Sequence, residues 1–214
     1  MLPAHGLASV YGPSASGKSF LALDMAAAVA SGREWFGYRV KPSPVVYCAL
    51  EGESGFRLRV AAWEQANGCA LPDSLRLVLQ PFKLTEPQDV PDMAAALLSA
   101  GAGAVTTLDT LNRAAPEADE NASADMSRIL EAAKTLQRLT GGLVILMHHT
   151  GKDTTKGLRG HSTCLLRWTL LWRSHAMVTA IRGAWQRQKT VPMVKRTRSV
   201  WRWSTSQQTT KATR

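Results

Sequence analysis

The chain has 214 residues, enough for one substantial hydrophobic core and too few for two full domains. Its formal net charge is +10, but every acidic residue lies at or before Asp153, so the first 153 residues are mildly acidic and the rest strongly basic. No apolar run is long enough to span a bilayer, and the N-terminus lacks the features of a signal peptide. The three widely spaced cysteines favour a reducing compartment. We therefore expect a cytoplasmic protein that does not enter a membrane.

Strands and helices are predicted to alternate along the first 147 residues. We predict strands at 7–11, 45–50, 75–79, 104–108 and 143–147, and helices at 18–31, 54–67, 89–100 and 122–139. Residues 33–44 are expected to be irregular because of their prolines, and residues 112–121 are expected to form a polar loop. Apolar strands without alternation, joined by single helices, are typical of an α/β protein with a mostly parallel central sheet flanked by helices.

A phosphate-binding loop is predicted between the first strand and the first helix. Residues 12–19, GPSASGKS, match G-x-x-x-x-G-K-[ST] at each position. The glycines let backbone N–H groups converge on a phosphate, and the following helix adds its own N–H groups and its dipole. We expect Lys18 to reach the β- and γ-phosphates and Ser19 to hold Mg²⁺. The candidate nucleotide-binding residues are Gly12, Pro13, Ser14, Ala15, Ser16, Gly17, Lys18, Ser19 and Phe20.

Two acidic residues end predicted strands at the same edge of the sheet as this loop. Asp109 follows the run AVTTL and is the candidate residue for holding Mg²⁺, through a water or through Ser19. Glu51 follows VVYCAL and is the candidate base for the water that attacks the γ-phosphate. Glu53 competes for that role, and the alternative for both glutamates is a solvated loop acid.

His148 and His149 end the last predicted strand. Adjacent strand residues point to opposite faces, and no third ligand stands at a metal-like spacing, so we do not expect a metal site here. One histidine is expected to face the γ-phosphate and sense bound triphosphate. We favour His149, although the sequence does not decide between the two. The basic loop at 150–163 either contacts phosphate of a nucleic acid or a neighbour's nucleotide, or is merely solvated.

Several segments, taken in order, resemble one family. GPSASGKS is followed by VVYCALEGE, AVTTLDTLNR, ADENASADM, GGLVILMHHTGK and GLRGHS. Over residues 2–162 the chain resembles the RecA-like P-loop ATPases of the plasmid and phage RepA replicative helicase family. The resemblance implies a RecA-like P-loop NTPase fold and a hexameric ring that hydrolyses ATP between subunits and moves along single-stranded DNA. By position it implies ATP and Mg²⁺ as cofactors, with roles for Lys18, Ser19, Glu51, Asp109, and His148 or His149.

The C-terminal part departs from this family. We predict an ATPase core over residues 1–163 and an atypical tail over residues 164–214, which has five of the seven tryptophans and no acid. Family members usually have more chain before LPAHGLA, so we expect Met1 to be an internal or truncated start. After GLRGHS they continue with acidic strands and a basic finger that reaches the neighbour's ATP. Our hypothesis is that the tail is out-of-frame translation from about residues 163–166; taken at face value, its Arg and Trp content favours nucleic-acid binding.

The sequence leaves several functions open. The first is an ATP-hydrolysing motor, a replicative DNA helicase of a plasmid or prophage, with single-stranded DNA as partner and a homo-oligomer, expected to be a hexamer. One alternative is a RecA-like ATPase of recombination or repair that does not unwind DNA. Another is a truncated nucleotide-binding remnant with little turnover. A small-molecule kinase is disfavoured because no Arg-rich lid lies between the central strands.

Overall fold

The computed structural model describes residues 2–119 and 122–149, so the predicted loop at 150–163 and the predicted tail at 164–214 lie outside the described residues. The boundary between core and tail therefore stays a prediction. In chain order, the described elements are β1 (Gly6–Gly12), α1 (Lys18–Ser31), β2 (Val45–Ala49), α2 (Glu53–Asn67), β3 (Leu75–Val78), α3 (Asp89–Ser99), β4 (Val105–Asp109), α4 (Leu111–Ala114), α5 (Ser123–Thr140) and β5 (Leu143–His149).

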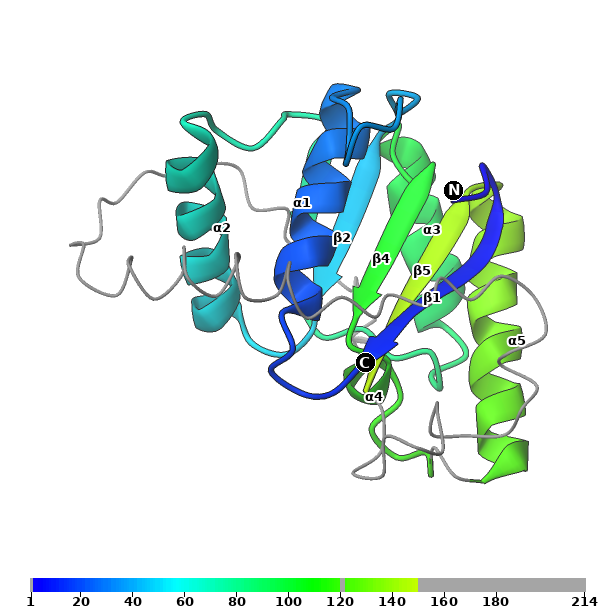
Figure 1. Cartoon of the computed structure of the whole chain (residues 1–214). Helices are drawn as coiled ribbons and strands as arrows, with labels where there is room; N and C mark the ends of the chain where they lie inside the picture. Colours follow the sequence, from blue (N-terminus) through cyan, green and yellow to red (C-terminus); the bar gives the residue numbers. More distant parts are fainter. Residues whose placement is uncertain (1, 120–121, 150–214) are drawn as a thin grey trace, which may run out of the picture.

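The strands form one sheet in the order β1-β5-β4-β2-β3, and every neighbouring pair is parallel (Figure 1). In a parallel sheet all carboxyl ends meet at one edge, where α/β proteins place their ligands. The register sets Gly12 beside His149, and Ala49 beside Asp109. This arrangement confirms the predicted α/β fold with a central parallel sheet flanked by helices.

Helices cover both faces of the sheet, with α1 and α2 on one side and α3 and α5 on the other (Figure 1). Successive residues of β2 show the alternation that produces these layers. Tyr47 packs on Phe56 of α2, with ring centroids 4.8 Å apart, whereas Cys48 joins Leu97 of α3 and Met126 of α5 on the other side. Because every residue of β2 is buried, the strand is apolar throughout instead of alternating.

Most observed boundaries lie within one residue of the predicted ones, and two differences are informative. β1 and β5 run on to Gly12 and His149, because the two strands stay paired through that last register position. A one-turn helix, α4, occupies the start of the region predicted as a polar loop at 112–121. Its two apolar residues, Leu111 and Ala114, are buried in the cluster beneath α3 and α5, which explains why this stretch does not remain a solvated loop.

Both cysteines in the described part of the chain are free thiols. Cys48 is buried, and burial raises its pKa to about 12, so this thiol stays protonated and unreactive. Cys69 is exposed. None of the described helices combines the length and apolarity needed to cross a bilayer.

Candidate phosphate-binding site

Residues 12–19 turn between β1 and α1 at the carboxyl edge of the sheet. Gly17, directly before α1, has a φ of 88°, which glycine adopts without steric cost, and Ala15 has a φ of 57°. Left-handed residues within such a loop turn successive backbone N–H groups toward one point, the geometry of an anion-binding nest. The N-cap of α1 is Gly17, which has no side chain to cap the helix, and the N-terminus of α1 with its positive dipole end faces this space.

The Lys18 ammonium lies at the centre of this loop. Its Nζ donates hydrogen bonds to the carbonyl oxygens of Gly12, at 2.9 Å, and Pro13, at 2.8 Å. Burial lowers the pKa of Lys18, and the nearby carboxylates of Asp109 and Glu51 oppose this effect. The loop therefore presents one cation, held by backbone carbonyl oxygens, to any ligand that enters it.

The alternation of β5 decides which histidine meets this loop. Met147 packs on the side of α1 and α2, whereas Leu146 packs on the side of α3 and α5. His149 therefore falls on the α1 side, and His148 falls on the other and is only 3% exposed. The Nδ1 atom of His149 lies 3.2 Å from Lys18 Nζ. The structure brings His149 and not His148 to the loop, while its role as a phosphate sensor stays a prediction.

A chain of hydrogen bonds joins Lys18 to Glu51 through His149. His149 Nδ1 faces Lys18 Nζ and also lies 3.3 Å from Ser14 Oγ, and His149 Nε2 lies 3.4 Å from Glu51 Oε1. An ammonium can only donate and an ionised carboxylate can only accept. The arrangement therefore fits a neutral imidazole that accepts from Lys18 at Nδ1 and donates to Glu51 from Nε2–H.

The two competing glutamates have different surroundings. Glu51 accepts a hydrogen bond from the Thr110 hydroxyl at 3.1 Å, in addition to its contact with His149. Glu53 instead accepts a hydrogen bond at 2.8 Å from Arg57 on its own helix, α2. Thr110 is 1% exposed and directly follows β4. No sequence pattern indicated Thr110 by itself, although its place directly after the strand-end Asp109 puts it at the carboxyl edge of the sheet.

Asp109 is a buried carboxylate with one oxygen available. Tyr47, which sequence reasoning missed, donates a hydrogen bond to Asp109 Oδ2 at 2.7 Å. The other oxygen, Oδ1, is buried and accepts no hydrogen bond of normal geometry from a described residue. Burial raises the pKa of Asp109, and the hydrogen bonds of Tyr47 and Ser19 oppose that rise. A cation at Oδ1 would offset the cost of burying this charge.

These groups fit a magnesium ion that is held largely by a nucleotide. Mg²⁺ prefers hard oxygen ligands, and it commonly uses one or two protein groups together with phosphates and waters. Ser19 and the free oxygen of Asp109 supply such oxygens. No cluster of three or more His, Cys, Asp or Glu residues in the described part of the chain is able to hold a metal by itself.

Phe20 lies in the first turn of α1, beside the second helix. The guanidinium of Arg59 on α2 lies 5.9 Å from the centre of its ring, within the range of a cation–π contact. Arg59 also lowers the pKa of Asp109, although it is the smallest of the influences there. The structure thus adds a cation next to the loop that the sequence patterns did not indicate.

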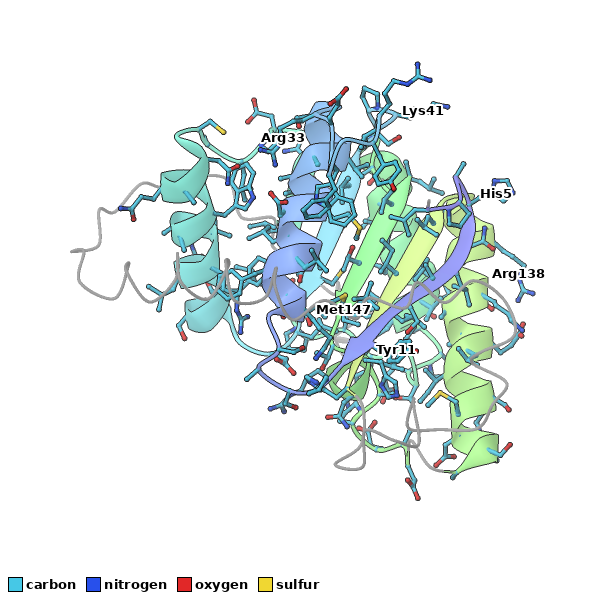
Figure 2. All side chains as sticks on the ribbon, in the orientation of Figure 1. His5, Tyr11, Arg33, Lys41, Arg138 and Met147 are labelled. Carbon is cyan, nitrogen blue, oxygen red and sulfur yellow. The ribbon has the colours of Figure 1, made fainter. Side chains whose placement is uncertain are left out.

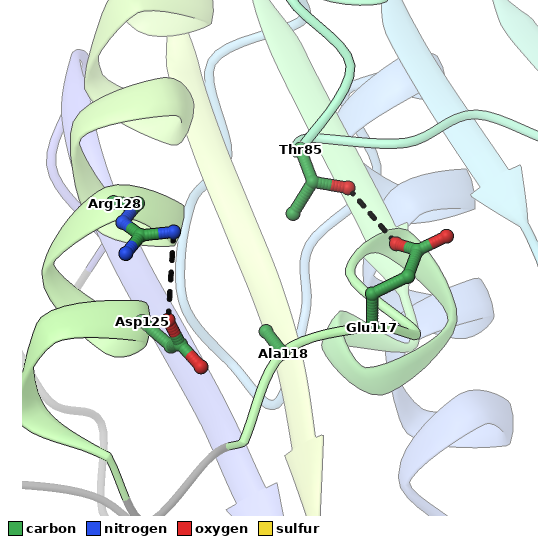
Figure 3. Close-up of a pocket in the computed structure, with 5 residues that line it drawn as sticks. All are labelled: Thr85, Glu117, Ala118, Asp125 and Arg128. Carbon is green, nitrogen blue, oxygen red and sulfur yellow. Dashed lines mark hydrogen bonds and ion pairs between the residues drawn. The ribbon is translucent and has the colours of Figure 1, made fainter.

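A separate shallow pocket lies between α5 and the segments at 85 and 117–118 (Figure 3). Its lining residues are Thr85, Glu117, Ala118, Asp125 and Arg128. The Thr85 hydroxyl donates to Glu117 at 3.2 Å, and Arg128 lies 3.7 Å from Asp125. Two carboxylates against one arginine disfavour a triphosphate here, so the loop at 12–19 remains the candidate site.

Comparison with known proteins gives one family and a set of similar folds. A family model described as an AAA domain matches residues 1–155. No curated protein matches the sequence. Matching solved structures include a KaiC-like protein from the hyperthermophilic archaeon Pyrococcus horikoshii OT3, with 14% identity and a TM-score of 0.46, and the RadB recombinase, with 24% identity and a TM-score of 0.43. Each alignment covers 71% of this chain and 64% of the solved structure's chain. This chain therefore spans less than two thirds of the length of either solved structure.

Proposed function

The chain belongs to the AAA domain family, and we propose that its described part is the ATP-binding core of a RecA-like motor ATPase. The observation that carries the proposal is a convergence at one edge of the sheet. The phosphate loop with Lys18, the His149 ring and the Glu51 carboxylate come from three different strand ends. One chain of hydrogen bonds joins Lys18 to His149 and His149 to Glu51. That set of groups suits phosphoryl transfer from ATP to water, in which the protein mainly positions the reactants and stabilises charge.

In this proposal the loop binds the triphosphate, and the Lys18 ammonium exchanges its backbone acceptors for phosphate oxygens. Its two backbone acceptors are carbonyl oxygens of the loop itself, and phosphate oxygens carry more negative charge, so the ammonium turns to the β- and γ-phosphates. Ser19 and Asp109 are the groups that would hold Mg²⁺, which neutralises phosphate charge when bound. Tyr47 keeps the Asp109 carboxylate oriented through its 2.7 Å hydrogen bond.

Glu51 acts as the general base in the same proposal. Its carboxylate accepts the proton of the attacking water, while Thr110 and His149 fix its orientation. Because His149 contacts both Lys18 and Glu51, a change at the phosphate end is transmitted to the base through one side chain. This is the proposed sensing role of His149.

The finer assignment rests on the resemblance of the ordered segments to the RepA replicative helicases. We propose that the intact motor is a homo-oligomer, a hexameric ring, that acts on single-stranded DNA of a plasmid or phage. A RecA-like ATPase of recombination or repair uses the same cradle and remains the alternative. The two differ in whether ATP hydrolysis is coupled to strand separation.

The test is ATP hydrolysis by the full chain with and without single-stranded DNA, together with a native mass measurement. We expect an oligomer whose turnover rises when DNA is added, and separation of a forked duplex distinguishes the helicase from the recombination ATPase. The Lys18→Ala variant, purified in parallel, reports contaminating activity. A monomer that binds ATP without DNA-stimulated turnover would overturn the motor proposal and leave nucleotide binding standing.

Replacing Thr110 by valine tests whether this residue positions the base. Valine has the same shape but cannot donate to Glu51, so we expect kcat to fall by about tenfold, the value of one hydrogen bond to a charged group. ATP affinity should stay unchanged because Thr110 does not belong to the phosphate loop. The Thr110→Ser variant keeps the hydroxyl and should restore most of the rate. Equal losses in both variants would indicate a packing role for Thr110 instead.

A further inference from the structure

A tight hairpin lies in the segment between α1 and β2, which was predicted to be irregular. Trp35 and Tyr38 form an isolated antiparallel bridge, with each backbone N–H donating to the other residue's carbonyl oxygen at 3.0 Å. The two residues between them, Phe36 and Gly37, have φ angles of 51° and 75°. Positive φ at both central positions is typical of a two-residue hairpin turn. We call residues 33–41 the aromatic hairpin.

The base of the aromatic hairpin is fixed to the body of the protein. The Trp35 indole donates to Asp24 Oδ2 on α1 at 3.0 Å. Arg33 donates to Asp24 Oδ1 at 2.9 Å and to Asn67 at the end of α2 at 2.8 Å. The same guanidinium lies 5.6 Å from the ring centre of Trp63. Two helices therefore hold the hairpin in place.

Its tip departs from the usual turn chemistry. The first central position of such a turn favours asparagine, aspartate or glycine, whereas a bulky residue at positive φ is a strained exception. Here that position holds Phe36, which is 46% exposed, and the next aromatic residue, Tyr38, is 69% exposed. Strain of this kind is commonly retained where a side chain has a function. Burial in the core does not explain either ring.

Unpaired cations follow the exposed rings. Arg39 and Lys41 are both exposed, and neither forms an ion pair with a described residue. Glu34 is the only acid between residues 33 and 41. Arg33 is already engaged with Asp24, so the free positive charge of the hairpin lies on the side that follows Tyr38.

The aromatic hairpin lies at the end of the sheet opposite the phosphate loop. α1 starts at the loop and ends at Ser31, directly before the hairpin. Figure 2 shows Arg33 and Lys41 at one end of the molecule and Tyr11, next to the loop, at the other. Substitutions in the hairpin therefore do not touch the groups assigned to ATP.

We propose that the aromatic hairpin binds single-stranded nucleic acid, with bases stacking on Tyr38 and Phe36 and phosphates meeting Arg39 and Lys41. Stacking rings interleaved with cations are the combination that single-strand binding uses. The alternative occupant is a second copy of this chain, since protein interfaces are also enriched in aromatic residues and arginine. Lys41 disfavours it, because lysine is depleted at such interfaces. The inference rests on the proposed function in one respect, the choice of single-stranded nucleic acid as the partner. The new part is the place on this chain where the strand binds.

The first test maps contacts directly. The full chain is irradiated with an oligothymidylate that carries iododeoxyuridine, and crosslinked peptides are identified by mass spectrometry. We expect crosslinks within residues 33–41. Crosslinks found only in other segments would overturn the proposal, whatever the overall affinity for DNA.

The second test measures affinity by fluorescence anisotropy of a labelled oligothymidylate without ATP. Tyr38→Ala combined with Arg39→Glu should weaken binding by about tenfold or more, and Tyr38→Phe should bind as tightly as the original chain. Arg128→Glu on α5 makes the same charge change elsewhere and is the matched control for Arg39→Glu. Equal effects of Arg39→Glu and Arg128→Glu, together with no effect of Tyr38→Ala, would contradict the proposal.

Two further measurements separate the possible failures. Native mass of the hairpin variants reports self-association: a changed oligomer with unchanged DNA affinity assigns the hairpin to a protein interface and overturns the proposal. Binding of a fluorescent ATP analogue should be the same in hairpin variants and the original chain. If the original chain did not bind the ATP analogue, the proposed function would be contradicted. The crosslinking result would still show whether the hairpin binds single-stranded nucleic acid.

Discussion

Replacing Lys18 by alanine should lower the affinity of the full chain for ATP by at least about 100-fold. The ammonium stands inside the phosphate loop, where it donates to the carbonyl oxygens of Gly12 and Pro13 at 2.9 and 2.8 Å. In the proposed complex these bonds are exchanged for two bonds to charged phosphate oxygens. Each is worth about 1.5–3 kcal/mol, and 1.4 kcal/mol corresponds to tenfold in affinity. Titration with a fluorescent ATP analogue measures the change.

A matched control for this variant is Lys134→Ala on α5. Lys134 is exposed and pairs only loosely with Glu131, at 3.6 Å, so its removal changes the net charge equally and leaves the loop intact. We expect its ATP affinity to lie within about twofold of the original chain. Thermal unfolding of both variants shows whether the loop variant still folds. A folded Lys18→Ala variant with undiminished ATP affinity would show that residues 12–19 are not the triphosphate site.

The fold could be predicted largely because its signals are local. The first helix has the predicted bounds, since glycines with positive φ end it and precede it. Strands such as β2 were recognisable because both faces are buried, which requires a continuous apolar run. Strand order could not be predicted, because it depends on which strands pair across the sheet. The extension of β5 to His149 follows from pairing with β1, and a single segment does not show that contact.

The candidate site was predictable as a set of residues at one edge of the sheet, but the contacts among them were not. Residue type and position at strand ends indicated Glu51, Asp109 and the histidine pair. The choice between the histidines depends on which face α1 covers, and only the packed sheet shows this. Tyr47 and Thr110 were missed because their hydrogen bonds, to Asp109 and Glu51, cross between neighbouring strands, and no local sequence pattern shows such a contact.

The aromatic hairpin is a second case in which tertiary contacts decide what the local sequence does not show. Pro42 and Pro44, which follow the hairpin, indicated that residues 33–44 are irregular, which is what such residues usually mean. The structure finds order there because Trp35 and Arg33 bond to Asp24, a residue on the preceding helix. Exposed rings on a hairpin that is held by the protein body indicate a binding surface, whereas exposed rings on an ordinary loop do not. Only the tertiary contacts distinguish these two cases.

Replacing Glu51 by glutamine should lower kcat for ATP hydrolysis by about 10²–10⁴-fold while ATP affinity stays within about twofold. Glutamine has the same shape, and its carbonyl oxygen still accepts from Thr110 and His149, which contact Glu51 at 3.1 and 3.4 Å. It does not accept a proton from water at neutral pH. The loss should therefore fall on the chemical step, which single-turnover kinetics with bound ATP measures separately from binding.

The neighbouring acid supplies the control for this variant, because Glu53→Gln makes the same change two residues away. Glu53 is about half exposed and pairs with Arg57, so its side chain is committed to the surface of α2 and not to the strand ends. We expect its kcat to remain within about twofold of the original chain. If Glu53→Gln lost turnover and Glu51→Gln kept it, Glu53 and not Glu51 would be the general base. The chain of hydrogen bonds from Lys18 through His149 would then end at a carboxylate without a catalytic role.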